Sequence, residues 1–282
     1  QQDLPHTRKH NLPGARTSFI GRERELVEIK RTLAMTGLMT LTGAGGSGKT
    51  RLALEIARGL VGVYPDGVWL VELGSLSEGE LVAQAVADAL GVREQPNRPL
   101  AYTLADALRE KKMLLLLDNC EHLLDAAARL VDTLLGSCPR LRILATGREA
   151  IGVPGEANWP VPPLSVPDAD SSPTDLMRYE AVRLFVERAR LRLPSFDLTP
   201  ASAQAVAEVC RRLDGIPLAI ELVTGRVTAL AIQQVAEGIE DSLSLLISGP
   251  RAATPRHQTM RATIEWSFAL LSEPEQALFN RL

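Results

Sequence analysis

The sequence predicts an α/β domain built on a parallel β-sheet, followed by a part of the chain that contains only helices. Short apolar runs at residues 38–42, 68–73, 113–118 and 141–146 alternate with segments of helical periodicity. The run at 113–118 is almost continuously apolar, which is typical of a parallel strand that is buried on both faces. From Glu180 onward, the apolar residues recur only at helical spacing. These observations together favour a sheet flanked by helices and then a helical domain.

The first part of the chain alternates helices with strands. Residues 1–17 are polar and lack periodicity, so we interpret them as a lead-in segment with the character of an interdomain linker. Leu26, Ile29 and Leu33 share one helical face, which predicts a helix at about 22–35. Further helices are expected at about 51–60, 78–90, 102–110 and 125–136, and a short fifth strand is expected at about 157–161.

Six prolines between residues 152 and 174 mark the end of the α/β domain. Thr199 followed by Pro200 is an N-cap with proline at the first helical position, which predicts a helix to about 213. Other helices are expected at 180–192, after the turn that begins at Asp214, near 231–237 and from about 260. We therefore predict an α/β domain at 18–165, a helical domain at 166–248 and the opening of a further helical unit at 249–282.

Composition excludes several classes of protein. The net charge is −3 and the pI is near 5.9, so the chain as a whole has no electrostatic attraction to nucleic acid. Cys120, Cys138 and Cys210 are scattered and odd in number, which favours apolar core positions and a reducing, cytoplasmic setting over a disulfide framework. No apolar run approaches the ~20 residues of a membrane span. The chain begins without methionine and stops inside an expected helix, so we interpret it as part of a longer protein.

Residues 43–50, here called the phosphate loop, read GAGGSGKT and match the pattern G-x-x-x-x-G-K-[ST] at every specified position. A strand precedes them and a helix follows, which is the context that a phosphate-binding loop requires. Glycines let successive N–H groups point at phosphate oxygens, and a helix that begins near Ser47 adds the positive end of its dipole. Lys49 supplies a cation for the β- and γ-phosphates, and Thr50 supplies a hydroxyl for Mg²⁺.

The expected nucleotide-contacting residues of this stretch are Gly43, Gly45, Gly46, Ser47, Gly48, Lys49, Thr50 and Arg51. The alternative is a glycine-rich turn without a ligand. The four specified residues would coincide by chance on the order of once in a hundred chains of this length. The flanking strand and helix lower that rate further, so we favour phosphate binding.

Asp118 ends the continuous apolar run, at the edge where ligands bind in open α/β sheets. An aspartate at this place is expected to hold Mg²⁺ through water, and the alternative is that it caps the next helix. The residue after it is Asn119, where many ATPases have a glutamate that orients the attacking water. Glu121 is the nearest carboxylate that could take this role, or else it is an acid in the first turn of the next helix.

Two further segments are candidates for nucleotide contact. Arg148 follows the strand at 141–146, and an arginine at such a strand tip can bind a γ-phosphate through its guanidinium fork. The alternative for Arg148 is an ordinary surface position. Phe19, Ile20 and Gly21 precede the first helix and suit a backbone that approaches a flat ligand closely, although on these residues alone a plain helix start is the favoured interpretation.

Five segments together resemble a known family. These are Phe19-Ile20-Gly21-Arg22, the phosphate loop, residues 114–119, Thr146-Gly147-Arg148 and Gly215-Ile216-Pro217-Leu218-Ala219. Their order and spacing resemble STAND-type ATPases with NB-ARC-like modules, a class that includes plant disease-resistance proteins. The phrases LDNCEHLLDAA, GIPLAIEL and TIEWSFALLSEPEQALF are most similar to the large bacterial transcriptional regulators of that class. The resemblance covers about residues 18–282.

The resemblance implies a strand order of 5-1-4-3-2, which places the strand of Arg148 between those of Lys49 and Asp118. It also implies that Ile20, Gly21 and Arg22 lie near the adenine, that Pro217 and Leu218 close over the nucleotide, and that Arg148 senses the γ-phosphate. Residues 249–282 would open a winged-helix domain whose ADP-binding histidine lies beyond Leu282. Asn119 departs from the family's acidic residue, which argues against rapid hydrolysis.

The function implied is a regulatory switch, closed with ADP and open with ATP, that controls a transcriptional regulator and hydrolyses ATP slowly. Its expected ligands are ATP or ADP with Mg²⁺. Its expected partners are other domains of the full-length protein and, in the ATP state, further copies of itself. DNA would be bound only through domains outside this chain, and no membrane is expected. The alternatives are an ordinary turnover ATPase, a DNA-binding module that uses the C-terminal piece, and a small-molecule kinase, which would need an acceptor-binding lid.

Overall fold

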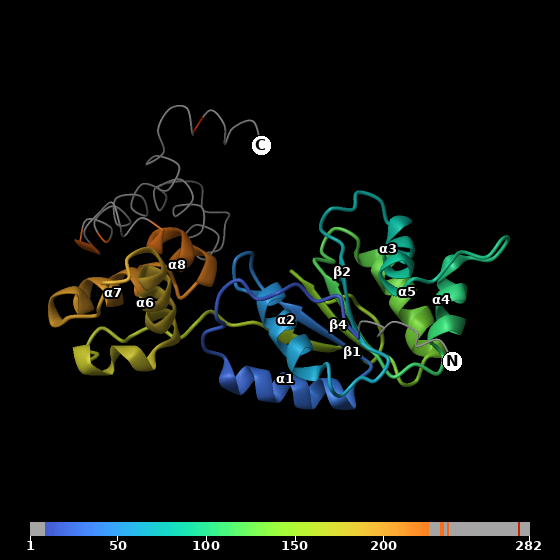
Figure 1. Cartoon of the computed structure of the whole chain (residues 1–282), viewed down its shortest axis with the longest axis horizontal. Coiled ribbons are helices and arrows are strands. Elements are labelled where there is room, and N and C mark those ends of the chain that lie inside the picture. The colour runs from blue at the N-terminus through green and yellow to red at the C-terminus, as the bar shows by residue number, and fades with distance from the viewer. Residues whose placement is uncertain (1–8, 226–231, 234–235, 237–275, 277–282) are drawn as a thin grey trace, which may run out of the picture. The chain divides into compact units, whose positions relative to one another are not determined.

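The computed structural model describes residues 9–225 together with 232, 233, 236 and 276 (Figure 1). The described chain divides into two compact units. The first unit comprises the residues up to 19 together with 23–43 and 49–161. The second comprises 20–22, 44–48 and the chain from Pro162 onward. The phosphate loop therefore contributes its ends to the first unit and its residues 44–48 to the second.

The first unit is a parallel sheet covered by helices on both faces (Figure 1). Its strands are β1 (Leu38–Thr42), β2 (Val68–Glu72), β3 (Leu114–Asp118), β4 (Arg142–Gly147) and β5 (Ala157–Pro160). Their order is β2-β3-β4-β1-β5, and every pairing is parallel. The predicted fold class and strand order are confirmed. The strand that leads to Arg148 lies between β1 and β3.

The side chains of β3 show why its sequence is continuously apolar. Leu115 and Leu117 pack in a core with α3 (Leu81–Leu90), α4 (Leu100–Leu108) and α5 (Leu124–Ser137). Leu114 and Leu116 point to the opposite face and pack in a core with α1 (Glu23–Met35) and α2 (Lys49–Leu60). Both faces of the strand are buried, so alternation with polar residues is not possible.

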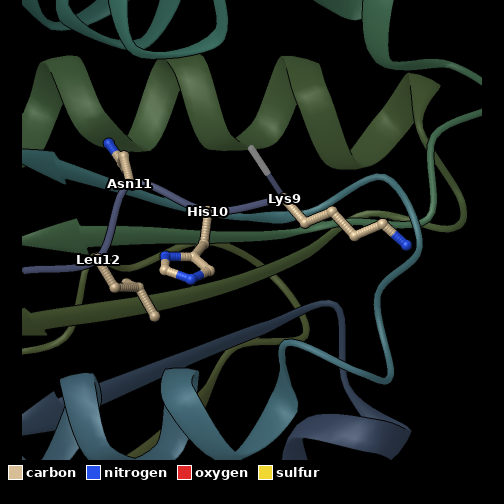
Figure 2. Close-up of a pocket in the computed structure, with 4 residues that line it drawn as sticks. All are labelled: Lys9, His10, Asn11 and Leu12. Carbon is tan, nitrogen blue, oxygen red and sulfur yellow. The ribbon is translucent and has the colours of Figure 1, made fainter. Parts of the chain in front are cut away.

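Residues 9–12 lie along the outer edge of β2, as Figure 2 shows. The N–H of Val68 donates to the carbonyl of Lys9 at 2.9 Å. The Asn11 side chain donates through Nδ2 to the Leu70 carbonyl at 2.7 Å, and its Oδ1 accepts from the Leu70 N–H at 2.6 Å. The side-chain amide of Asn11 thus takes the place of a backbone partner and satisfies the N–H and the carbonyl of Leu70 at the outer edge of β2. This part of the expected lead-in segment therefore pairs with the sheet.

The second unit is helical in its described part from Pro173 onward. A 3₁₀ turn (Pro173–Arg178) precedes α6 (Glu180–Arg192), α7 (Pro200–Arg212) and α8 (Pro217–Thr224). Thr199 caps α7, with the reciprocal hydrogen bonds of a capping box to Ser202. Phe185 lies at the centre of the core that these helices share. Most of the helix expected near 231–237, and the winged-helix opening expected at 249–282, lie outside the described residues.

The three cysteines are buried free thiols, as expected for core positions. Burial raises the pKa of the Cys120 thiol to about 12 and also raises the pKa values of Cys138 and Cys210. Within the part of the chain that the structure describes, no helix has the length and apolar character needed to cross a membrane.

Candidate functional site

The phosphate loop runs from the end of β1 to the start of α2. The sequence led us to expect a helix from about Ser47, but α2 begins two residues later, at Lys49. The reason is backbone conformation, because Gly46 and Gly48 have φ angles of 77° and 85°. Left-handed residues cannot belong to a right-handed helix, and glycine adopts them without steric cost. The loop therefore keeps a non-helical conformation as far as Gly48, the residue before Lys49.

Lys49 lies at the start of α2 in the first unit. Its Nζ donates a hydrogen bond of 2.8 Å to the carbonyl of Gly43, at the other end of the loop. The pKa of the Lys49 ammonium is lowered, mainly because the group is partly buried. The negative charges of Glu121 and Asp118 act to raise it, and the positive charge of Arg148 acts to lower it. The three other charged residues that the sequence named as catalytic candidates, Glu121, Arg148 and Asp118, thus lie near enough to Lys49 to affect its charge.

Asp118 joins the ends of β3 and β4 to the start of α2. Its Oδ1 accepts hydrogen bonds from the hydroxyl of Thr50 at 2.7 Å and from the hydroxyl of Thr146 at 2.6 Å. The side chain is buried, whereas Thr50 is exposed. The next helix, α5, begins only at Leu124, so the alternative in which Asp118 caps that helix is wrong. The sequence placed Thr146 at the end of its strand, but no role was predicted for its side chain.

Asn119 has a left-handed backbone, with φ at 65°. Asparagine tolerates this conformation better than most residues with a β-carbon. Its N–H donates to the Thr146 hydroxyl at 2.9 Å, and its Nδ2 would lie 2.7 Å from a β-carbon placed on Gly74. The Asn119 side chain is therefore beside the segment that follows β2. The left-handed backbone and the close approach to Gly74 explain why an asparagine suits this position.

Glu121 and Arg148 form an ion pair, with Nε and Oε1 separated by 3.0 Å. Glu121 precedes α5 by three residues, so the alternative that it belongs to the first turn of that helix is wrong. The side chain of Arg148 is 63% exposed and that of Glu121 is 26% exposed. His122 places Nε2 2.8 Å from the carbonyl of Leu76.

The second unit contains residues 20–22 and the middle of the phosphate loop. Arg22 is 2% exposed and has a left-handed φ of 61°, which is rare for a residue with a long side chain. Its Nη2 donates to the carbonyl of Ser47 at 2.6 Å and to the carbonyl of Pro162 at 2.9 Å. In this structure Arg22 therefore holds the loop backbone through Ser47.

Glu180, at the start of α6, anchors this segment and was not identified from the sequence. Its Oε1 accepts from the N–H of Arg22 at 2.5 Å, and its Oε2 accepts from the N–H of Ser165 at 3.0 Å. A β-carbon on Gly21, whose φ is 75°, would lie 2.6 Å from the same Oε1. Gly21 is thus required both by its backbone angle and by the close approach of Glu180. Ile20 packs against the helical core.

The start of α8 also contacts residues 44–48 within the second unit. The N–H of Leu218 donates to the carbonyl of Gly46 at 3.2 Å. A β-carbon on Gly48 would lie 3.7 Å from Cγ of Pro217, so α8 begins close to the loop backbone. The sequence named Pro217 and Leu218 as nucleotide contacts, and the structure places both beside this part of the phosphate loop.

Arg51 lies one residue after Thr50 on α2. Its Nη2 donates to the carbonyl of Ser18 at 2.7 Å and to the carbonyl of Thr17 at 3.2 Å, and it also bonds the Thr17 hydroxyl. Arg58, further along α2, donates to the carbonyl of Pro13 at 3.0 Å. Arg51, expected to contact nucleotide, therefore holds the chain that precedes α1.

The residues of the loop and the sheet edge fit a nucleotide phosphate with Mg²⁺. Lys49 supplies a cation, and the first turn of α2 supplies N–H groups without intrahelical acceptors. Thr50 and Asp118 supply oxygen atoms, the ligand type that Mg²⁺ prefers, and Mg²⁺ needs only one or two such groups from the protein when phosphates supply others.

The chain is similar in sequence to several bacterial proteins. Residues 34–150 match the family described as AAA domain. The chain is 42% identical over 279 residues to the uncharacterized protein Rv0894 of Mycobacterium tuberculosis, covering 99% of this chain and 67% of that protein. It is 47% identical over 254 residues to Rv0890c, a proposed HTH-type transcriptional regulator of the same organism, covering 90% of this chain. It spans only 27% of that regulator's length, or about a quarter.

A more distant relative is the regulatory protein AfsR of Streptomyces griseus, with 27% identity over 291 residues. The match covers 96% of this chain and 27% of AfsR.

Two solved structures share the fold. One is the STAND protein PH0952 of Pyrococcus horikoshii, which has a tetratricopeptide repeat sensor; the TM-score is 0.51 at 16% identity, covering 89% of this chain and 40% of that one. The other is Drosophila ORC bound to DNA. Its TM-score is 0.52 at 11% identity, and the match covers 89% of this chain and 80% of that one. Identities this low establish the fold alone. From its sequence relatives, the chain belongs to the family of the mycobacterial protein Rv0894, and its residues 34–150 match the AAA domain.

Proposed function

We propose that this chain is the nucleotide-operated switch of a larger bacterial transcriptional regulator, with ADP and ATP favouring different states. The observation that carries the proposal is the cluster around Lys49. It combines a phosphate-binding cation, the Thr50–Asp118 pair and an arginine at the tip of β4. Relatives that are named as transcriptional regulators support a place within a larger regulator, because the chain covers only about a quarter of the length of Rv0890c. The signal and the output would then belong to other parts of the full-length protein.

In this proposal each residue has one task. Lys49 binds the β- and γ-phosphates, and the N–H groups of the loop bind the remaining phosphate oxygens. Thr50 holds Mg²⁺ directly, and Asp118 holds it through water. When bound, Mg²⁺ would neutralise phosphate charge. Arg148 contacts the γ-phosphate, which ADP lacks, so it gives the two nucleotides different binding energies.

Slow hydrolysis follows from the residue after Asp118. The side-chain amide of Asn119 cannot accept a proton from water, and its Nδ2 lies beside Gly74. A slowly hydrolysing site suits a switch, because the ATP state must persist long enough to be read. We further propose that copies associate in the ATP state and that DNA is bound by other domains.

An ordinary turnover ATPase is the second candidate, since the same loop serves both functions. The test has two parts. We expect protein purified without added nucleotide to release ADP on denaturation, detected by chromatography, and to hydrolyse saturating Mg–ATP far more slowly than ~1 per second, a typical lower value for enzymes. Turnover at or above that rate would favour the turnover enzyme. Failure to bind either nucleotide would contradict both.

A further inference from the structure

We propose that Glu121 tunes the preference between ATP and ADP by holding Arg148 in an ion pair that a γ-phosphate must break. This inference rests on the proposed function, in which Arg148 contacts the γ-phosphate. The pair joins the turn after β3 to the tip of β4, with 3.0 Å between Nε of Arg148 and Oε1 of Glu121. Without a third phosphate, Arg148 keeps this carboxylate as its partner.

The backbone keeps the two residues together. The N–H of Cys120 donates to the carbonyl of Thr146 at 2.9 Å, which ties the turn before Glu121 to the end of β4. A β-carbon on Gly147 would lie 3.9 Å from the backbone nitrogen of Glu121. The Glu121–Arg148 pair therefore forms between two segments that are already held side by side by main-chain contacts, and it is not needed to hold them.

Exposure makes the pair easy to exchange. The Arg148 side chain is 63% exposed, and an ion pair in that setting contributes little to stability. A guanidinium binds carboxylate and phosphate with the same fork geometry, so a γ-phosphate is a direct competitor of Glu121. ATP binding thus includes the cost of breaking the pair, whereas ADP binding does not.

The test is a set of titrations with ADP and with a non-hydrolysable ATP analogue, both with Mg²⁺. Glu121→Gln keeps the shape of the side chain and removes its charge. We expect it to tighten binding of the ATP analogue by about 1.4- to 5-fold, the range that exposed ion pairs span, and to leave ADP affinity unchanged. In an Arg148→Ala background, Glu121→Gln should change neither affinity.

Glu149→Gln is the matched control, because Glu149 is exposed, directly follows Arg148 and forms no ion pair among the described residues. It should change neither affinity. Tighter ATP binding from Glu121→Gln that persists in the Arg148→Ala background would overturn the inference, since removal of a negative charge near phosphate would then suffice. Unchanged binding in the Glu121→Gln variant would overturn it too.

The two proposals fail differently. If Arg148→Ala weakens the ATP analogue selectively but Glu121→Gln has no effect, only the role of Glu121 is wrong. If Arg148→Ala weakens both nucleotides equally, or the wild-type chain binds neither, the proposed function fails and the inference fails with it.

Discussion

The hydroxyl of Thr50 donates a hydrogen bond of 2.7 Å to Oδ1 of Asp118 and so joins the first turn of α2 to the end of β3. Because its proton is directed to the carboxylate, the lone pairs of this hydroxyl are left for another partner. Thr146 donates to the same oxygen from β4 at 2.6 Å. Three elements that are far apart in the sequence therefore fix one carboxylate beside the phosphate loop.

Lys49→Ala should weaken ADP binding by roughly 1.5–3 kcal/mol, the range for a charge-assisted hydrogen bond. The variant removes the ammonium that we expect to bind phosphate, together with its hydrogen bond to the carbonyl of Gly43. Calorimetric titration with ADP measures the loss. Lys111→Ala is the control, because that lysine pairs with Asp66 on the surface. Equal affinity in wild type and Lys49→Ala would contradict the assignment of the phosphate loop.

Asp118→Asn should reduce the gain in ADP affinity that Mg²⁺ provides and leave affinity without Mg²⁺ nearly unchanged. Asparagine keeps an oxygen that can accept from Thr50 and Thr146, so the variant removes charge more than structure. The measurement is ADP affinity in EDTA and in excess Mg²⁺. A similar fall under both conditions would mean that Asp118 has a structural role and does not hold the metal.

The same substitution at two buried threonines should have opposite effects on stability. Thr146→Val removes a hydroxyl that donates to Asp118 and accepts from Asn119, so the free energy of unfolding should fall by about 1 kcal/mol. The Thr40 hydroxyl is buried in β1 without a hydrogen-bond partner among the described residues. Thr40→Val should therefore raise the free energy of unfolding by up to about 1 kcal/mol, since an unsatisfied polar group is removed.

Urea denaturation of both variants provides the measurement, and Thr146→Ser should restore most of the loss at that position. A loss of stability in Thr40→Val as large as that in Thr146→Val would show that valine simply fits poorly in this sheet.

Asn11→Asp should loosen the outer edge of β2. A carboxylate cannot donate to the Leu70 carbonyl as the amide of Asn11 does, so one of the two hydrogen bonds is replaced by repulsion. We expect a loss of about 1–3 kcal/mol in the free energy of unfolding and faster hydrogen exchange at the N–H of Leu70. Exchange at Leu116, in the centre of β3, is the internal reference. Unchanged exchange at Leu70 would contradict the pairing of residues 9–12 with β2.

The order of the elements and the residues at the sheet edge could be predicted from the sequence, because their signals are local. The apolar run of β3 and the glycines, lysine and threonine of the phosphate loop each lie within a few neighbouring positions. Asp118 was identifiable for the same reason, since it ends a strand whose periodicity is visible. The strand order itself came from resemblance and not from periodicity.

What the sequence did not reveal depends on contacts between distant positions. Glu180 binds the backbone of Arg22 across 158 residues, and nothing near Glu180 distinguishes it from an ordinary acid at a helix start. Asn11 pairs with Leu70 through a side chain that replaces main-chain groups, so the sequence around Asn11 shows no strand periodicity that would predict this pairing. The pairing of Glu121 with Arg148 likewise appears only once β3 and β4 lie next to each other.

Arg148→Ala tests whether this chain distinguishes ATP from ADP through the tip of β4. Wild type and variant are titrated by calorimetry with ADP and with a non-hydrolysable ATP analogue in the presence of Mg²⁺. We expect the variant to lose roughly 1.5–3 kcal/mol of binding energy for the ATP analogue and almost none for ADP, because only ATP offers a γ-phosphate to the guanidinium. Equal losses for both nucleotides, or no loss for either, would contradict this expectation.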